Sequence, residues 1–313
     1  MPLDPQVKAF LDQMKAVEGP KMQDAGPVAA REAFAALMQL VGPKDVPVGK
    51  TLNRTVPGVG GVPVPIRITT PVAAGGEPLP ALIYFHGGGF VIGNIETHDG
   101  LCRLMANEGG FRVISVDYRL APEHKYPAAI DDAFSALSWI VENAADIGVD
   151  ANRIAVGGDS AGGALAAEVA QLAKTKGISI DAQLLLFPVT QIGAETRSLK
   201  EFAVGYFLER DTLEWFYKCY LPDGADKSDP RISPLRAKDL SGLPPAYVIL
   251  GGFDPLRDEG MEYADKLRAA GVKVTVAEYE GMVHCFTYLQ SVLPQAHEAL
   301  AKASKAIAGM FTK

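Results

Sequence analysis

A serine at position 160 is the residue of this chain best placed to do covalent chemistry. It stands at the centre of the sequence Gly-Asp-Ser-Ala-Gly, residues 158–162, between a short, mostly apolar run and an alanine-rich helical stretch. A serine hydroxyl is a poor nucleophile unless a sharp strand-to-helix turn exposes its oxygen to a base and to a substrate carbonyl. The two glycines leave room for that turn. The pattern therefore predicts Ser160 as a nucleophile that attacks a carbonyl carbon.

A run of three glycines offers donors for the negative charge that such a reaction develops. Residues 86–90 read His-Gly-Gly-Gly-Phe and follow a candidate strand at 81–85. Glycines at a strand end expose backbone N–H groups with no side chains in the way, and such loops build oxyanion holes. A flexible turn is the alternative, but three glycines have a high ordering entropy. We predict that the N–H groups of Gly88, Gly89 and Ala161 form an oxyanion hole.

Asp254 is the best-placed carboxylate to orient a catalytic base. It lies on the loop that follows the candidate strand at 246–250. A helix N-cap is the alternative role, because Asp followed by Pro commonly begins a helix. The rivals Asp258 and Glu259 fall in or near the first turn of the next helix, where helix-dipole or surface roles suit them better. We predict Asp254 as the orienting acid.

His284 is the predicted base among five histidines. It follows the last candidate strand, and the chain order of Ser160, Asp254 and His284 is the order found in α/β-fold hydrolases. His86 adjoins the glycine loop, and His98 and His124 are expected in connecting loops. His297 is expected on the C-terminal helix. Together the three predicted residues would form a Ser-His-Asp triad.

Short β-rich runs alternate with helical patterns from about residue 62 onward. These elements must position the glycine loop and the three predicted triad residues. Such alternation is typical of the α/β class, in which helices cover both faces of a mostly parallel sheet. Continuous apolar runs such as residues 184–187 fit strands that are buried on both faces. The candidate strands are residues 63–69, 81–85, 113–117, 154–157, 183–187, 246–250 and 274–279.

Two amphipathic patterns predict helices over residues 130–141 and 296–307. Their apolar residues recur at positions i, i+4, i+7 and i+11, which places them on one helix face. In the first pattern we expect Asp131, Asp132 and Glu142 to point away from the core.

Two stretches interrupt the alternation. The first 50 residues hold two helical patterns before any candidate strand, and residues 191–225 form a long, aromatic-rich insertion between two strands. These segments could be additional core. The more specific prediction is a cap over the carboxyl ends of the strands, where open α/β sheets place their sites.

Composition narrows the class of partner. The formal charge of −7 comes from 30 basic and 37 acidic residues with no basic cluster, which argues against nucleic acid and anionic membranes as partners. No stretch approaches the roughly 20 apolar residues of a membrane span, and we expect a cytoplasmic protein. The three cysteines, Cys102, Cys219 and Cys285, lie far apart and are expected to be reduced thiols rather than a metal site.

The chain resembles the hormone-sensitive-lipase-like branch of the α/β-hydrolases, the bacterial family IV carboxylesterases. The Asp at position 159 is similar to that of the GDSAG subgroup. No motif position departs from the family pattern, and the similar stretches are distributed over most of the chain. They are residues 86–90, 117–124, 158–162, 205–208, 254–259 and 281–286.

The resemblance implies an α/β-hydrolase fold with an eight-stranded, mostly parallel sheet and a helical cap. It assigns residues 1–50 and 191–225 to the cap and residues 51–190 and 226–313 to the catalytic domain. It also implies hydrolysis of short to medium acyl esters without a cofactor or a metal, and homodimers through an edge strand occur in similar esterases. By similarity, Leu208, Leu213 and Phe216 of the insertion would line an acyl pocket, although they could equally be cap core.

Two other functions stay open at this point. A related hydrolase acting on amides, lactones or acetylated sugars would use the same triad, and only the pocket would distinguish it. The same fold also serves plants as a non-catalytic hormone receptor with an incomplete triad. Because all three triad candidates are present here, the receptor is the less favoured alternative.

Overall fold

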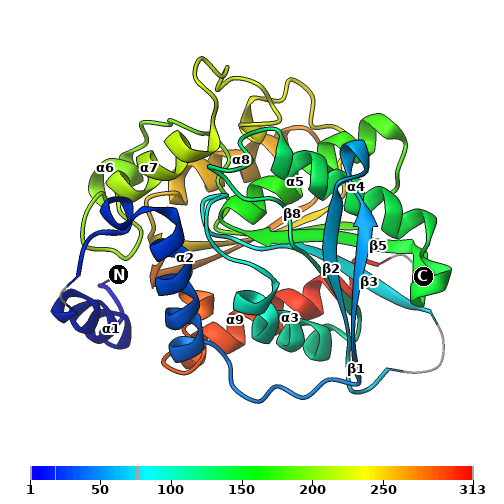
Figure 1. Cartoon of the computed structure of the whole chain (residues 1–313), viewed down its shortest axis with the longest axis horizontal. Coiled ribbons are helices and arrows are strands. Elements are labelled where there is room, and N and C mark those ends of the chain that lie inside the picture. The colour runs from blue at the N-terminus through cyan, green and yellow to red at the C-terminus, as the bar shows by residue number, and fades with distance from the viewer. Residues whose placement is uncertain (1, 18, 75–77, 312–313) are drawn as a thin grey trace.

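The fold is built on one central sheet. The computed structural model describes residues 2–17, 19–74 and 78–311. Within these residues eight strands form one sheet in the order β1-β2-β4-β3-β5-β6-β7-β8 (Figure 1). Their bounds are β1 Lys50–Pro57, β2 Pro63–Thr70, β3 Leu79–Phe85, β4 Arg112–Val116, β5 Val149–Asp159, β6 Ala182–Leu186, β7 Ala246–Phe253 and β8 Val274–Val283.

The sheet is mostly parallel, which confirms the predicted class. Strand β2 pairs antiparallel with β1 and with β4, and all the other neighbours are parallel. The seven candidate strands are present as β2 to β8. The residue patterns missed β1, because it is an edge strand in which only Val56 is buried and whose polar residues look like a loop.

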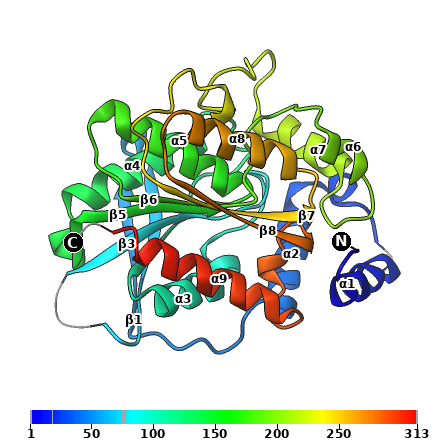
Figure 2. The ribbon, with the colours of Figure 1, turned by 180° about the vertical axis from the view of Figure 1, so that it is seen from behind.

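Helices cover both faces of the sheet (Figures 1 and 2). On one face lie α4 (Ala128–Glu142), α5 (Ala161–Lys176) and α8 (Arg257–Ala269). On the other face α3 (Ile95–Gly109) packs against α9 (Pro294–Ala308). Side chains on both faces of the central strands are therefore buried and apolar, as Leu184, Leu185 and Leu186 of β6 show.

One polar residue of α4 departs from the expected pattern. Asp132 is fully buried, so the prediction that it points away from the core is wrong. The Arg119 guanidinium donates to both carboxylate oxygens of Asp132, at 2.8 and 2.7 Å, and the Arg119 backbone N–H donates to Asp132 Oδ2 at 3.0 Å. A buried charge is stable only when paired, and this pair fixes α4 to the loop after β4.

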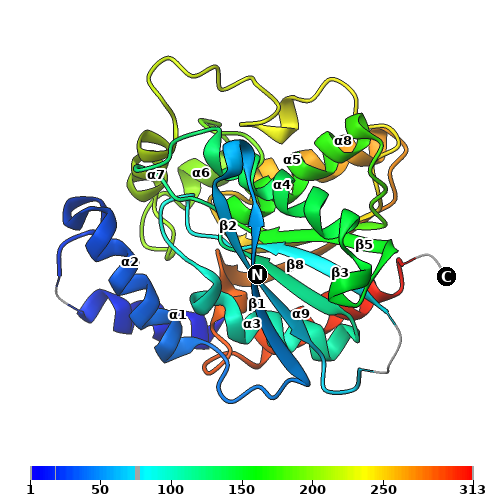
Figure 3. The same cartoon turned by 45° about the vertical axis from the view of Figure 1, so that its right-hand side comes forward.

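Four helices gather at one end of the sheet (Figure 3): α1 (Pro5–Ala16), α2 (Met22–Val41), α6 (Arg197–Glu201) and α7 (Arg210–Tyr220). The two N-terminal patterns thus form helices as predicted. Helix α2 contacts α7, and the rings of Phe10 and Phe207 lie 5.7 Å apart, so the N-terminal segment packs on the insertion. Among the described residues, no helix has the length and apolarity to cross a membrane.

Candidate active site

Ser160 stands on a sharp turn between β5 and α5. Its backbone has φ 53° and ψ −117°, a strained conformation for a residue with a side chain. A Cβ on Gly158 would overlap the carbonyl of Gly162, and a Cβ on Gly162 would overlap the carbonyl of Phe85. The Ser160 N–H donates to Leu186 O at 2.9 Å, which fixes the turn to β6. The predicted turn therefore exists, and it requires both glycines.

The structure brings Ser160, Asp254 and His284 together at the carboxyl ends of three strands. His284 Nε2 lies 2.9 Å from Ser160 Oγ, and His284 Nδ1 lies 2.8 Å from Asp254 Oδ2. All three side chains are buried. A carboxylate on one ring nitrogen leaves the other nitrogen to take a proton from the serine, which is the geometry of general-base activation.

Asp254 also accepts a hydrogen bond from the backbone two residues further along the chain. Its Oδ1 accepts a hydrogen bond from Leu256 N at 2.8 Å, while its Oδ2 faces His284. The N-cap position of α8 itself is Leu256, so Asp254 sits on the turn before the helix. This backbone bond holds the carboxylate in the orientation that the histidine needs.

The rival carboxylates have other partners. Asp258 Oδ2 accepts from Ser198 N at 2.8 Å. Glu259 lies in the first turn of α8 as expected, but it is buried, so a surface role is wrong for it. Its Oε1 accepts from the backbone N–H groups of Thr190 and Gln191. Burial raises the pKa of Glu259 to about 8. Neither carboxylate has a hydrogen bond to His284.

Among the described residues, no histidine other than His284 has a hydrogen bond to the serine hydroxyl. His98 was expected in a loop but lies on α3, buried, with its Nε2 3.2 Å from Tyr288 Oη. His86 stacks on Tyr118 with ring centroids 4.3 Å apart, and burial lowers its pKa to about 3. His297 lies on α9, 3.7 Å from Glu108.

The glycine loop lies beside the nucleophile. Gly88 and Gly89 have φ of 117° and 60°, and both line one cavity with Ser160 and His284. Ala161 is the first residue of α5, where a helix leaves its N–H groups without partners. Within the described ranges no group accepts a hydrogen bond from the backbone N–H of Gly88, Gly89 or Ala161. These donors are therefore free for a ligand.

A cavity of about 420 Å³ opens over the serine. Leu208 and Phe216 line it, as expected for an acyl pocket. The sequence reasoning missed the contribution of the N-terminal helices and of the loop after β8. Their lining residues are Leu11, Met14, Met22, Phe34, Leu37 and Tyr288. The apolar residues of the two N-terminal helical patterns were the available signal.

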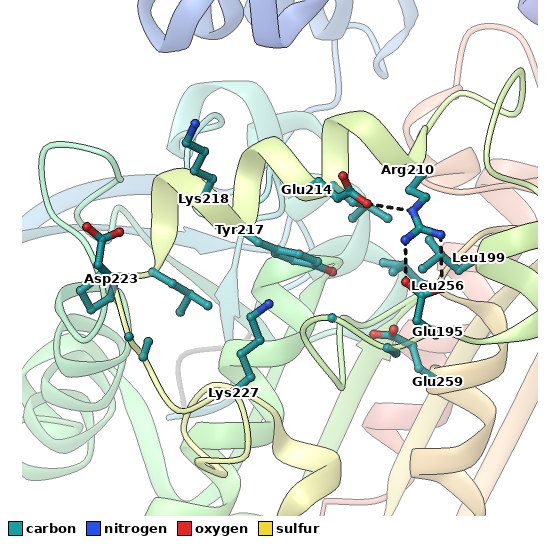
Figure 4. A pocket seen from close by; sticks show the side chains of 17 residues that line it. Glu195, Leu199, Arg210, Glu214, Tyr217, Lys218, Asp223, Lys227, Leu256 and Glu259 are labelled. Atoms are coloured by element: carbon teal, nitrogen blue, oxygen red, sulfur yellow. Dashed lines mark hydrogen bonds and ion pairs between the residues drawn. The ribbon is translucent and has the colours of Figure 1, made fainter.

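Leu213 does not line this cavity, so its predicted place in the acyl pocket is wrong. It lines a second cavity of about 470 Å³ on another side of α7. Figure 4 shows the polar lining of that cavity, where Arg210 bridges Glu195 and Glu214. Helix α7 thus lies between two cavities: Thr212 and Phe216, four residues apart, line the catalytic one. Leu213 and Tyr217, also four residues apart, line the second one.

Comparisons with known proteins agree with this geometry. A family model described as alpha/beta hydrolase fold matches residues 82–288. The carboxylic ester hydrolase LipN of Mycobacterium tuberculosis is 42% identical over 296 residues, which cover 92% of this chain and 77% of LipN. The ethyl acetate hydrolase of Pseudomonas putida is 37% identical over 320 residues, covering 98% and 99% of the two chains.

Solved structures give the same result. An alpha/beta hydrolase enzyme from the metagenome of Lake Arreo, Spain, superposes with a TM-score of 0.96 at 42% identity, covering 99% of this chain and 98% of its own. An esterase of Pyrobaculum calidifontis superposes with a TM-score of 0.92 at 40% identity, with 99% coverage of both chains. The chain therefore belongs to the α/β-hydrolase family, in its branch of bacterial hormone-sensitive-lipase-like carboxylic ester hydrolases.

Proposed function

We propose that the chain hydrolyses short to medium acyl-chain carboxylic esters through an acyl-enzyme on Ser160. The contact between His284 Nε2 and Ser160 Oγ carries this proposal, since it places a base on the nucleophile. As Ser160 Oγ attacks the ester carbonyl, His284 takes the hydroxyl proton and then gives it to the leaving alcohol. A water that His284 deprotonates next attacks the acyl-enzyme, which releases the acid and restores Ser160. Asp254 holds the histidine in the required tautomer.

The oxyanion hole of the proposed mechanism consists of the N–H groups of Gly88, Gly89 and Ala161. All three belong to residues that adjoin the nucleophile or line the same cavity, and all three lack a partner within the described residues. Such donors stabilise the tetrahedral intermediate because they are already oriented before charge develops on the carbonyl oxygen.

The proposed substrate range rests on the catalytic cavity. Its walls come mainly from apolar side chains of α1, α2 and the segment from Phe207 to Phe216, and its volume is about 420 Å³. Such a cavity fits an acyl chain of moderate length better than a polar sugar. Ethyl acetate is the substrate in the name of one relative, and arylesterase is the name of another, from Saccharolobus solfataricus, at 37% identity.

Three further points of the proposal concern the whole protein. We assign residues 1–50 and 191–225 to a cap, because α1, α2 and α7 supply walls of the catalytic cavity. Strand β8 ends the sheet, and its position at the edge supports a homodimer through that strand. The free thiols of Cys102, Cys219 and Cys285 favour a reducing, cytoplasmic location, and the sequence around Asp159 favours the GDSAG subgroup.

An acyl-chain panel tests the function. Purified protein and its Ser160→Ala variant are assayed with 4-nitrophenyl esters from acetate to palmitate, together with matched amides, lactones and acetylated sugars. We expect the highest kcat/KM at butyrate to octanoate and a fall of at least about 10⁴-fold in Ser160→Ala. Preference for an amide, lactone or acetylated sugar would replace the ester assignment. Absence of Ser160 labelling by a fluorophosphonate would favour the receptor.

A further inference from the structure

Asp159, the residue before the nucleophile, contacts the glycine loop of residues 86–90. Asp159 is fully buried at the end of β5. Its Oδ1 accepts the backbone N–H of Gly87 at 3.0 Å and the hydroxyl of Tyr84 at 2.6 Å. One carboxylate therefore joins the nucleophile turn to the residue that directly precedes Gly88 and Gly89.

The second carboxylate oxygen extends this connection to two other elements. Asp159 Oδ2 accepts the hydroxyl of Tyr288, a residue that lines the catalytic cavity, and lies 3.7 Å from His98 Nε2 on α3. A Cβ on Gly87 would overlap this oxygen. The carboxylate thus lies directly against the Gly87 backbone, and it leaves that residue no room to shift toward it.

The charge state suits this role. Burial alone would raise the pKa of Asp159, but His98 and the hydroxyls of Tyr288 and Tyr84 bring the pKa below its ordinary value. Burial and the Asp159 charge raise the pKa values of Tyr84 and Tyr288 well above the usual range, so both hydroxyls stay protonated donors. A charged acceptor makes a stronger hydrogen bond to the Gly87 N–H than a neutral one.

We infer that Asp159 is a positioning residue, which holds the Gly87 backbone so that the N–H groups of Gly88 and Gly89 point at the oxyanion. The inference rests on the proposed function. Removing the carboxylate should weaken binding of the transition state while substrate binding is retained, because Asp159 contacts the loop and not the substrate. Its effect should therefore appear in kcat rather than in KM.

The test compares two ligands of opposite character in the full-length protein. An aliphatic trifluoromethyl ketone forms a tetrahedral oxyanion on Ser160, whereas the parent methyl ketone binds only as a substrate mimic. In Asp159→Ala and in Asp159→Ser, whose side chain is too short to reach Gly87, we expect kcat for 4-nitrophenyl butyrate to fall about 100-fold. The Ki of the trifluoromethyl ketone should rise by a similar factor, while KM and the Ki of the methyl ketone change less than threefold.

Two further variants separate positioning from simple stability. Asp159→Asn keeps an oxygen for the Gly87 N–H and should recover kcat to within about tenfold of wild type. Asp132→Asn alters an equally buried carboxylate outside the site and should leave the ratio of the two Ki values unchanged.

The inference is overturned by any of three results: equal weakening of both ketones, no weakening of the trifluoromethyl ketone, or an Asp159→Asn variant as impaired as Asp159→Ala. If Asp159→Ala does not fold, kcat and the two Ki values are compared between Asp159→Ser and wild type instead. A wild-type protein that binds the trifluoromethyl ketone but hydrolyses no ester would refute the proposed function. The ketone affinities would still test Asp159 in that case.

Discussion

The ring of Phe216 lies where a side chain on Gly89 would be. This contact joins α7 of the insertion to the glycine loop, and Gly89 also has φ +60°. Gly89→Ala should therefore displace either the loop or the ring, and we expect kcat for 4-nitrophenyl butyrate to fall about 100-fold, as when an oxyanion donor is lost. The double variant Gly89→Ala/Phe216→Ala removes the overlap and should recover part of that loss.

Gly177→Ala is the matched control for Gly89→Ala. Gly177 has φ +71° at the end of α5, but a Cβ there would meet no atom within 4 Å. The substitution should cost about 1 kcal/mol of unfolding free energy and leave kcat unchanged. Equal kcat values for Gly89→Ala and wild type would show that the loop tolerates displacement.

The hydrogen bond between Asp254 and His284 sets the second prediction. Asp254→Asn keeps the shape of the side chain but offers an amide where the histidine ring needs an acceptor, which favours the wrong tautomer. We expect kcat to fall by about 10³- to 10⁴-fold at neutral pH. Asp258→Asn, four residues along the chain, should stay within about threefold of wild type because Asp258 bonds Ser198 and not the histidine. Similar losses in both variants would move the orienting role away from Asp254.

The triad could be predicted from sequence because each residue follows a strand, and parallel strands bring their carboxyl ends to one edge of the sheet. Ser160, Asp254 and His284 needed only strand order and loop position. The residues that line the cavity were harder to predict from sequence, since the direction in which Leu213 points depends on how α7 packs. Burial of Asp132 and Glu259 was missed because their partners, Arg119 and the Thr190 backbone, are distant in sequence or carry no side-chain signal.

Glu259 makes the stability of the protein depend on pH. Its pKa of about 8 in the folded state lies above the ordinary value of 4.5, so the folded state holds a proton that the unfolded state has already released. Unfolding then releases a proton between these two pH values, and stability falls as the pH rises from about 4.5 to about 8. Glu259→Gln removes this titration but keeps an oxygen for the N–H groups of Thr190 and Gln191.

The melting temperature of Glu259→Gln relative to wild type should therefore increase between pH 5 and pH 8, by about a few °C. Scanning fluorimetry in a constant-ionic-strength buffer series measures it. Asp265→Asn, at an exposed position on the same helix, should show a nearly constant difference across the series. A constant difference for Glu259→Gln as well would mean that the carboxyl ionises alike in both states.

Leu208 and Leu213 allow a direct test of which face of the α7 region limits the acyl chain. Both side chains are buried, but Leu208 lines the catalytic cavity and Leu213 lines the second one. Leu208→Phe should shorten the space for a long acyl group, so kcat/KM for 4-nitrophenyl octanoate should fall about tenfold relative to the acetate ester. Leu213→Phe adds the same volume on the other side and should leave the octanoate-to-acetate ratio within about twofold. If Leu213→Phe changed the ratio as strongly as Leu208→Phe, the effect would come from movement of α7 as a whole rather than from contact with the acyl chain.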